Sequence, residues 1–90
     1  MDVNAAHATI LTRLLEAEAV RISVEVETVA DPNVFEERCQ DLRDCRRMAD
    51  HIRSGRVALA RRLFALMSEP ELILPSEVTK WLEQRGGRLD

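Results

Sequence analysis

Aromatic residues are scarce in this chain of 90 residues, which has two Phe, one Trp and no Tyr. A core with so few aromatic rings must be built from Leu, Val, Ile, Ala and Met. This composition favours packed helices, because Ala and Leu are strong helix formers. Hydrophobic residues still make up 46% of the chain and charged residues 32%, which is too apolar for a disordered protein. We therefore expect a folded, mainly helical protein.

Cysteine is also rare, with Cys39 and Cys45 the only two. Six residues apart on one helix, they would lie about 9 Å apart along the axis, beyond the ~7 Å Cα limit for a disulfide. Neither a CxxC nor an HxxxH spacing is present, so no metal site is predicted and both cysteines are interpreted as small core residues. No export signal or bilayer-length apolar run occurs. We expect a cytoplasmic protein with free thiols and no membrane association.

Motifs of catalysis are missing as well. The chain has three glycines, and none belongs to a phosphate-binding loop, a GxSxG turn or a dinucleotide fingerprint. Nucleophilic catalysis by a cysteine would require a positioned base, and the sequence shows none. We predict no catalytic residue, no cofactor and no small-molecule substrate, and expect that the protein is not an enzyme.

Although the net charge of the chain is -3, its middle segment is basic: residues 43 to 62 hold seven arginines against two acids. A solvated helix face with ion pairs is the ordinary meaning of such a run. The alternative is an anion or acidic-partner site, either on a binding protein or in a small helical enzyme with an arginine-lined anion site. Asp50 lies within the arginine arc and would repel a phosphate, so nucleic acid is not expected as a partner. The candidate residues are Arg43, Arg46, Arg47 and Arg53.

Proline and glycine divide the chain into helical segments. Without a repeat or a linker, we predict a single domain over residues 1–90. A first helix is expected from about Asn4, a second from Pro32 with Asp31 as its cap, a third over 56–67, and a fourth that is capped by Ser76 and stops at Gly86. The prediction is an all-α fold, either a small bundle or an elongated hairpin of three to four helices. In the second helix, Phe35, Leu42 and Ile52 are the predicted core.

Residues 20–29 fit two secondary structures. Val20, Ile22, Val24 and Val26 alternate with polar residues, as in a half-buried strand. The same residues also keep helical spacing, and a long first helix is favoured. A strand here would make the order strand, helix, helix, which resembles the ribbon–helix–helix repressors, in which two chains insert a paired ribbon into the DNA major groove. The outward face departs from that family's basic or polar ribbon, since it would be Arg21, Ser23, Glu25 and Glu27.

Gly55 decides between two architectures. A left-handed glycine cap would end the second helix and give a compact bundle. A helix that continued through Leu59, Leu63 and Leu66 would have about 36 residues and extend ~54 Å, against a diameter of ~25 Å for a compact domain of this size. Such a helix would need a partner along its length.

Apolar residues exceed what one stripe per helix requires. A short chain with wide apolar stripes leaves apolar surface for a partner or a second copy. We therefore predict a small protein–protein interaction module, such as an adaptor, a chaperone or an inhibitor of a larger protein, that also self-associates as a homodimer. The predicted partner-binding residues are Leu59, Leu66, Leu72, Ile73 and Leu74.

Overall fold

The structure is a computed structural model that describes residues 3–86, with side chains from residue 6 to residue 84. These residues form four α-helices and one short 3-10 helix, and no strand occurs among them. The elements are α1 (Val3–Val26), α2 (Pro32–Arg53), α3 (Val57–Leu66), η1 (Pro70–Leu72) and α4 (Ser76–Gly86). The predicted all-α fold is confirmed.

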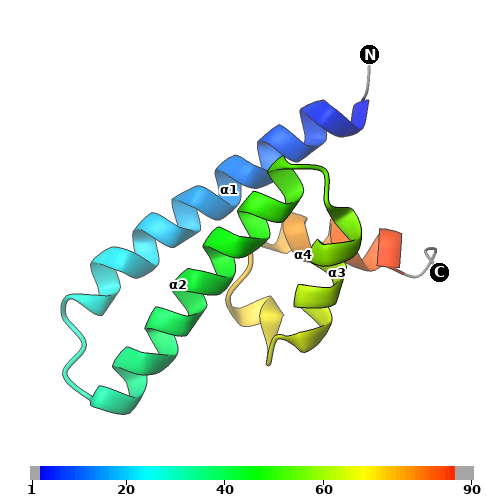
Figure 1. Cartoon of the computed structure of the whole chain (residues 1–90). Helices are drawn as coiled ribbons and strands as arrows, with labels where there is room; N and C mark the ends of the chain where they lie inside the picture. Colours follow the sequence, from blue (N-terminus) through cyan, green and yellow to red (C-terminus); the bar gives the residue numbers. More distant parts are fainter. Residues whose placement is uncertain (1–2, 87–90) are drawn as a thin grey trace.

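Helices α1 and α2 form a long antiparallel hairpin, and α3, η1 and α4 pack together on one side of it (Figure 1). The molecule measures 46 × 24 × 18 Å. It therefore combines the two predicted architectures, with an elongated hairpin and a small bundle at one end. The hairpin tip, between the C-terminus of α1 and the N-terminus of α2, extends beyond the bundle (Figure 1).

The boundaries of α2 follow the predicted signals. At its start, the Asp31 carboxylate accepts a hydrogen bond from the Asn33 backbone N–H at 2.9 Å, and Pro32 occupies the first turn, where its missing N–H costs nothing. At its end, Gly55 has φ +75, a left-handed conformation that glycine adopts without steric cost. The helix therefore breaks at Gly55, and the alternative of a continuous 36-residue helix is wrong.

Residues 20–29 do not form a strand. Helix α1 continues to Val26, and the chain then turns, with Glu27 N–H donating to the Val24 carbonyl at 3.2 Å. Helical spacing prevailed because it places Ile22 and Val26 in the same buried row as the apolar residues before them. The paired ribbon required by the ribbon–helix–helix resemblance is therefore absent from this segment, and that premise is wrong.

The core lies where the bundle meets the hairpin. Of the three core residues predicted on α2, Ile52 is buried and Leu42 is half-buried against the core. Phe35 is 45% exposed, so that prediction is wrong: it lies at the hairpin tip, which α3 and α4 do not reach (Figure 1). The buried apolar residues are Leu11, Leu15, Ala19, Ile22, Val26, Cys45, Met48, Ala49, Ile52, Ala60, Leu74, Val78, Trp81 and Leu82.

Helix α4 begins one residue earlier than its predicted cap implies. Ser76 is the first residue of the helix, and the Pro75 carbonyl accepts hydrogen bonds from the N–H groups of Val78 at 2.9 Å and Thr79 at 3.2 Å. Pro75 thus occupies the capping position through its backbone. The Ser76 prediction is corrected for that reason.

Candidate functional site

A groove of about 540 Å³ separates α2 from the segment formed by α3 and η1. We call it the α2–α3 groove. Its two walls differ in chemistry: every lining residue from α2 is polar or charged, whereas most of those from the opposite wall are apolar. The lining residues are Glu37, Arg38, Gln40, Asp41, Asp44 and Arg47 on α2, and Leu63, Leu66, Met67, Ser68, Glu69, Leu72 and Ile73 on the other wall.

The apolar wall depends on a tight reversal of the chain after α3. Met67 leaves the helix in an extended conformation, and Glu69 then adopts φ 52 and ψ 55, in the left-handed region. A non-glycine residue pays roughly 1–2 kcal/mol for that conformation. Pro70 follows and begins η1. The reversal brings Leu72 back to the groove that Leu66 already lines.

Leu66 and Leu72 are the most exposed large apolar residues in the described part of the chain, at 78% and 70%. Ile73 is half-buried and packs against the core beneath them. The structure thus brings three of the five predicted partner-binding residues into one groove. Two exposed leucines that line the same groove offer apolar surface of the kind that partners cover.

The other two predicted residues lie elsewhere. Leu59 is 40% exposed on α3 but does not line the groove. Leu74 is 4% exposed, so its prediction as a partner-binding residue is wrong. It belongs to the core because the chain turns inward at Leu74 before Pro75 starts the approach to α4.

The polar wall is acidic. Glu37, Asp41 and Asp44 follow one another at helical spacings of four and three residues, and all three line the groove. With Glu69 opposite, the groove holds four carboxylates against Arg38 and Arg47. The sequence-based prediction did not include this row, because the arginine excess of the same helix masks it. The four-and-three spacing is the signal that would have revealed it.

Asp41 is the most perturbed carboxyl group of this wall. Partial burial raises the pKa of Asp41 above its ordinary value, because a low-dielectric environment disfavours the charged form. The Arg38 guanidinium, 3.1 Å away, opposes the increase, while Asp44 and Glu37 add to it. Asp44 in turn accepts a hydrogen bond from Gln40 at 3.0 Å. A cationic group entering the groove would relieve the repulsion among these carboxylates.

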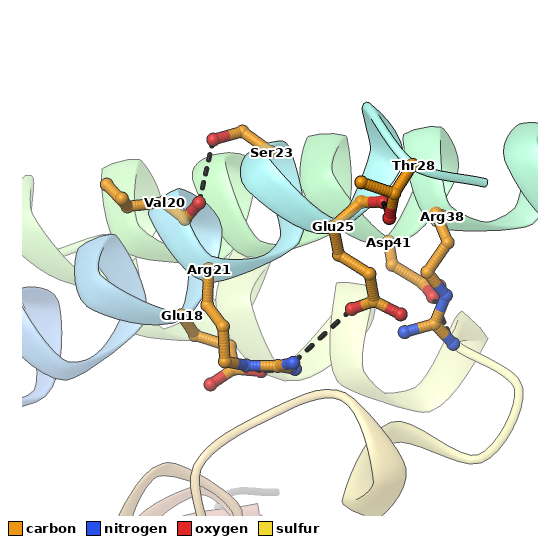
Figure 2. Close-up of polar contacts among 8 residues, drawn as sticks. All are labelled: Glu18, Val20, Arg21, Ser23, Glu25, Thr28, Arg38 and Asp41. Carbon is orange, nitrogen blue, oxygen red and sulfur yellow. Dashed lines mark hydrogen bonds and ion pairs between the residues drawn. The ribbon is translucent and has the colours of Figure 1, made fainter.

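Helix α1 contributes a partly compensated charge cluster next to this wall (Figure 2). Arg21 lies between Glu18 and Glu25: it binds Glu18 closely, and its Nη1 is 3.3 Å from Glu25 Oε1. The hydrogen bond to Glu18 is the main reason that the pKa of Arg21 is raised. Arg21 thus offsets one of the two carboxylates beside it. The carboxylates that line the groove itself come from α2 and from Glu69.

The structure does not gather the four candidate arginines into an anion site. Arg53 pairs with Glu16 of α1 and lies 3.7 Å from Asp50, which also pairs with Arg56 at 2.7 Å. Arg43 donates to Gln40 at 3.0 Å, whereas Arg47 lines the groove. The side chains of Arg43, Arg47 and Arg53 thus make different contacts, and Asp50 lies beside Arg53 alone of the four. Arg46 is exposed.

The two cysteines differ in burial. Cys45 is buried, and burial raises the pKa of its thiol to about 12, with Glu18, Asp41 and Asp44 adding to the effect and Arg21 opposing it. Cys39 is half-buried on the same helix. Over residues 3–86, no three His, Cys, Asp or Glu side chains are grouped so that they could hold a metal ion. Within that same range, no helix combines the length and apolar character needed to cross a bilayer.

A second hollow of about 510 Å³ lies between α3 and α4. Its lining is Ala58, Arg61, Arg62, Phe64, Ala65, Leu82 and Glu83. It has no exposed apolar anchor comparable to Leu66 or Leu72, because Leu82 is buried and Phe64 is half-buried. The α2–α3 groove is therefore the stronger candidate site.

Comparisons of the chain with protein-family models, with curated proteins and with solved structures gave no match.

Proposed function

We propose that the protein is a binding module without catalytic activity, and that it accepts an amphipathic segment of a partner protein in the α2–α3 groove. The observation that carries the proposal is the pairing of two highly exposed leucines, Leu66 and Leu72, with a facing row of carboxylates. Apolar anchors at one side of a helical segment would cover the leucines. Basic side chains on its flank would meet the acidic wall.

The chemistry of the groove supports binding over catalysis. Asp41 carries a carboxyl group with a raised pKa, but its neighbours are other carboxylates and an arginine rather than a nucleophile. A repulsive acidic wall is instead suited to attract a cationic segment and to accelerate its association. Adaptors, chaperones and inhibitors all bind a partner through such a contact, and they differ in the effect that binding has on the partner. We place this activity in the cytoplasm, with which two free thiols are compatible.

A peptide panel tests the recognition chemistry directly. The probes are fluorescent 15-residue amphipathic helices that have leucines at positions i, i+3, i+4 and i+7 and either arginine or glutamate on the flanks. Fluorescence anisotropy should show binding of the arginine series, weakened by added salt because the contacts are solvent-exposed. Equal binding of the glutamate series, or binding of neither, would contradict the proposed groove chemistry.

Matched variants assign the binding to the groove. Leu66→Glu and Leu72→Glu should each weaken the arginine series at least tenfold, since each buries a carboxylate where an apolar anchor would lie. Leu59→Glu is the control, because Leu59 is exposed on the same helix but outside the groove. A photoreactive amino acid at position 66, compared with one at position 59, should crosslink a host protein through an apolar and basic segment.

A further inference from the structure

Helix α1 is apolar on both sides, but the described fold covers only one of them. The covered side packs against α2 and the core through Leu11, Leu15 and Ile22. No other described element lies beyond α1 on the side away from α2 (Figure 1). Ile10, Val20 and Val24 of α1 are 57%, 63% and 59% exposed. These three belong to a row of exposed residues that we call the α1 outer stripe: Ala6, Ile10, Arg13, Ala17, Val20 and Val24.

The spacing within this stripe is four, three, four, three and four residues. It is the heptad spacing of a helix that packs lengthwise against another helix, with a mean of 3.5 residues between seam positions. An ordinary surface helix requires only one apolar stripe, the one that faces its own core. The second stripe on α1 thus has the spacing of a seam for a further helix.

We propose that this helix is α1 of a second copy of the chain, in antiparallel orientation. The stripe is complementary to itself in that orientation: Ile10 lies opposite Val20 of the second copy, Ala6 opposite Val24, and Arg13 opposite Ala17. The two-fold symmetry repeats each contact. Two of these three pairs oppose a small residue to a larger one, which allows close packing of the two helices.

Arg13 determines the orientation. In a parallel pair, each Arg13 would face the Arg13 of the other copy in the same layer, which places like charges in the seam. In the antiparallel pair it lies opposite an alanine and next to Glu16 of the second copy. Arg13 has no ion-pair partner among the residues that the structure describes. Glu16 binds its own Arg53 through Oε2, which leaves Oε1 for the second copy.

The shape of the molecule is compatible with this pairing. Helices α3 and α4 pack on one side of the hairpin (Figure 1), and the residues of the α1 outer stripe stay exposed. The antiparallel orientation places the two bundles at opposite ends of the dimer. From residue 6 to residue 24 the stripe spans ~27 Å, which is a small interface, so we expect a dissociation constant in the micromolar range.

Sedimentation equilibrium from about 1 μM to 1 mM tests the dimer. Val20→Glu should raise the dissociation constant at least thirtyfold, because two carboxylates would enter the seam, and its melting temperature should stay close to that of the native chain because Val20 is exposed in the monomer. Leu66→Glu is the matched control, since it places the same charge on another exposed residue, in the α2–α3 groove, and should leave the dimer intact. It also separates this inference from the proposed function, because Leu66→Glu should weaken peptide binding and Val20→Glu should not.

Crosslinking tests the register. In a Cys39→Ser background, a mixture of Ile10→Cys and Val20→Cys chains should form a disulfide between the two variants, whereas neither should crosslink to itself. Self-crosslinking of Ile10→Cys would indicate a parallel pair and overturn the proposal. A chain that stays at 10.3 kDa up to 1 mM, or a dimer that Val20→Glu leaves unchanged, would also overturn it. So would capture of a different protein on the stripe of a monomeric chain.

Discussion

Leu66 and Leu72 line the same groove although they belong to different helices, with the left-handed Glu69 between them. Leu66 ends α3 and Leu72 ends η1. The reversal at Glu69 gives the apolar wall its second anchor, and that wall faces the acidic residues of α2. A partner segment that covered both leucines would therefore lie within reach of Asp41 and Asp44.

Asp41 should oppose folding at neutral pH. Because its pKa is raised in the folded protein, the folded state holds this proton more tightly than the unfolded state. Protonation of Asp41 therefore stabilises the fold as the pH falls through the raised pKa, and its ionised form at pH 7 is disfavoured. We expect Asp41→Asn to raise the free energy of unfolding at pH 7 by up to about 1 kcal/mol, with a smaller gain near pH 4.

Urea unfolding at the two pH values measures this difference. Glu36→Gln is the control, because it removes the same charge from an exposed position on α2 and should leave stability nearly unchanged. The more stable Asp41→Asn variant should bind the arginine-flanked peptides less tightly, since the acidic wall loses one charge. An Asp41→Asn variant that is less stable than the native chain at pH 7 would show that the Arg38 pair outweighs the repulsion.

Gly55→Ala should destabilise the protein by roughly 1–2 kcal/mol, because alanine pays the cost of the left-handed conformation that glycine avoids. No atom lies within 4 Å of a Cβ built at this position, so backbone strain alone sets the penalty. Thermal unfolding should show a decrease of several degrees in melting temperature. Ser54→Ala is the control, with φ -88. A Gly55→Ala chain that gained helix content without losing stability would indicate a helix that continues through residue 55.

The two cysteines should differ in reactivity by a large factor. A thiol pKa of about 12 for Cys45 leaves about one thiolate in 10,000 at pH 8, and burial blocks access as well. Titration with a chromogenic disulfide reagent should therefore modify one thiol per native chain, Cys39, and the second only after unfolding in urea. Cys39→Ser should abolish the fast phase. Equal rates for both thiols in the native chain would contradict the burial of Cys45.

Capping residues in the sequence were sufficient to predict helix boundaries in the segments that contain them. Asp31 and Pro32 predicted the start of α2, which is confirmed. At Gly55 the sequence left a break and a continuous helix open, and the structure has the break. The strand alternative arose because Val20, Ile22, Val24 and Val26 satisfy two periods at once. Periodicity of a single segment could not choose between them, since the choice depends on which residues find a partner surface.

The prediction of the partner-binding surface likewise succeeded in part from the sequence and in part needed the tertiary structure. The sequence alone indicated surplus leucines and a basic middle, and thereby a helical protein with apolar surface to cover. It could not separate Leu72, which is 70% exposed, from Leu74, which is 4% exposed, because both belong to one short apolar run. Only the tertiary structure decided which of them faced the groove, since burial depends on where the chain turns relative to α2 and α4. Composition and capping residues determined the helices; the packing of distant segments determined the site.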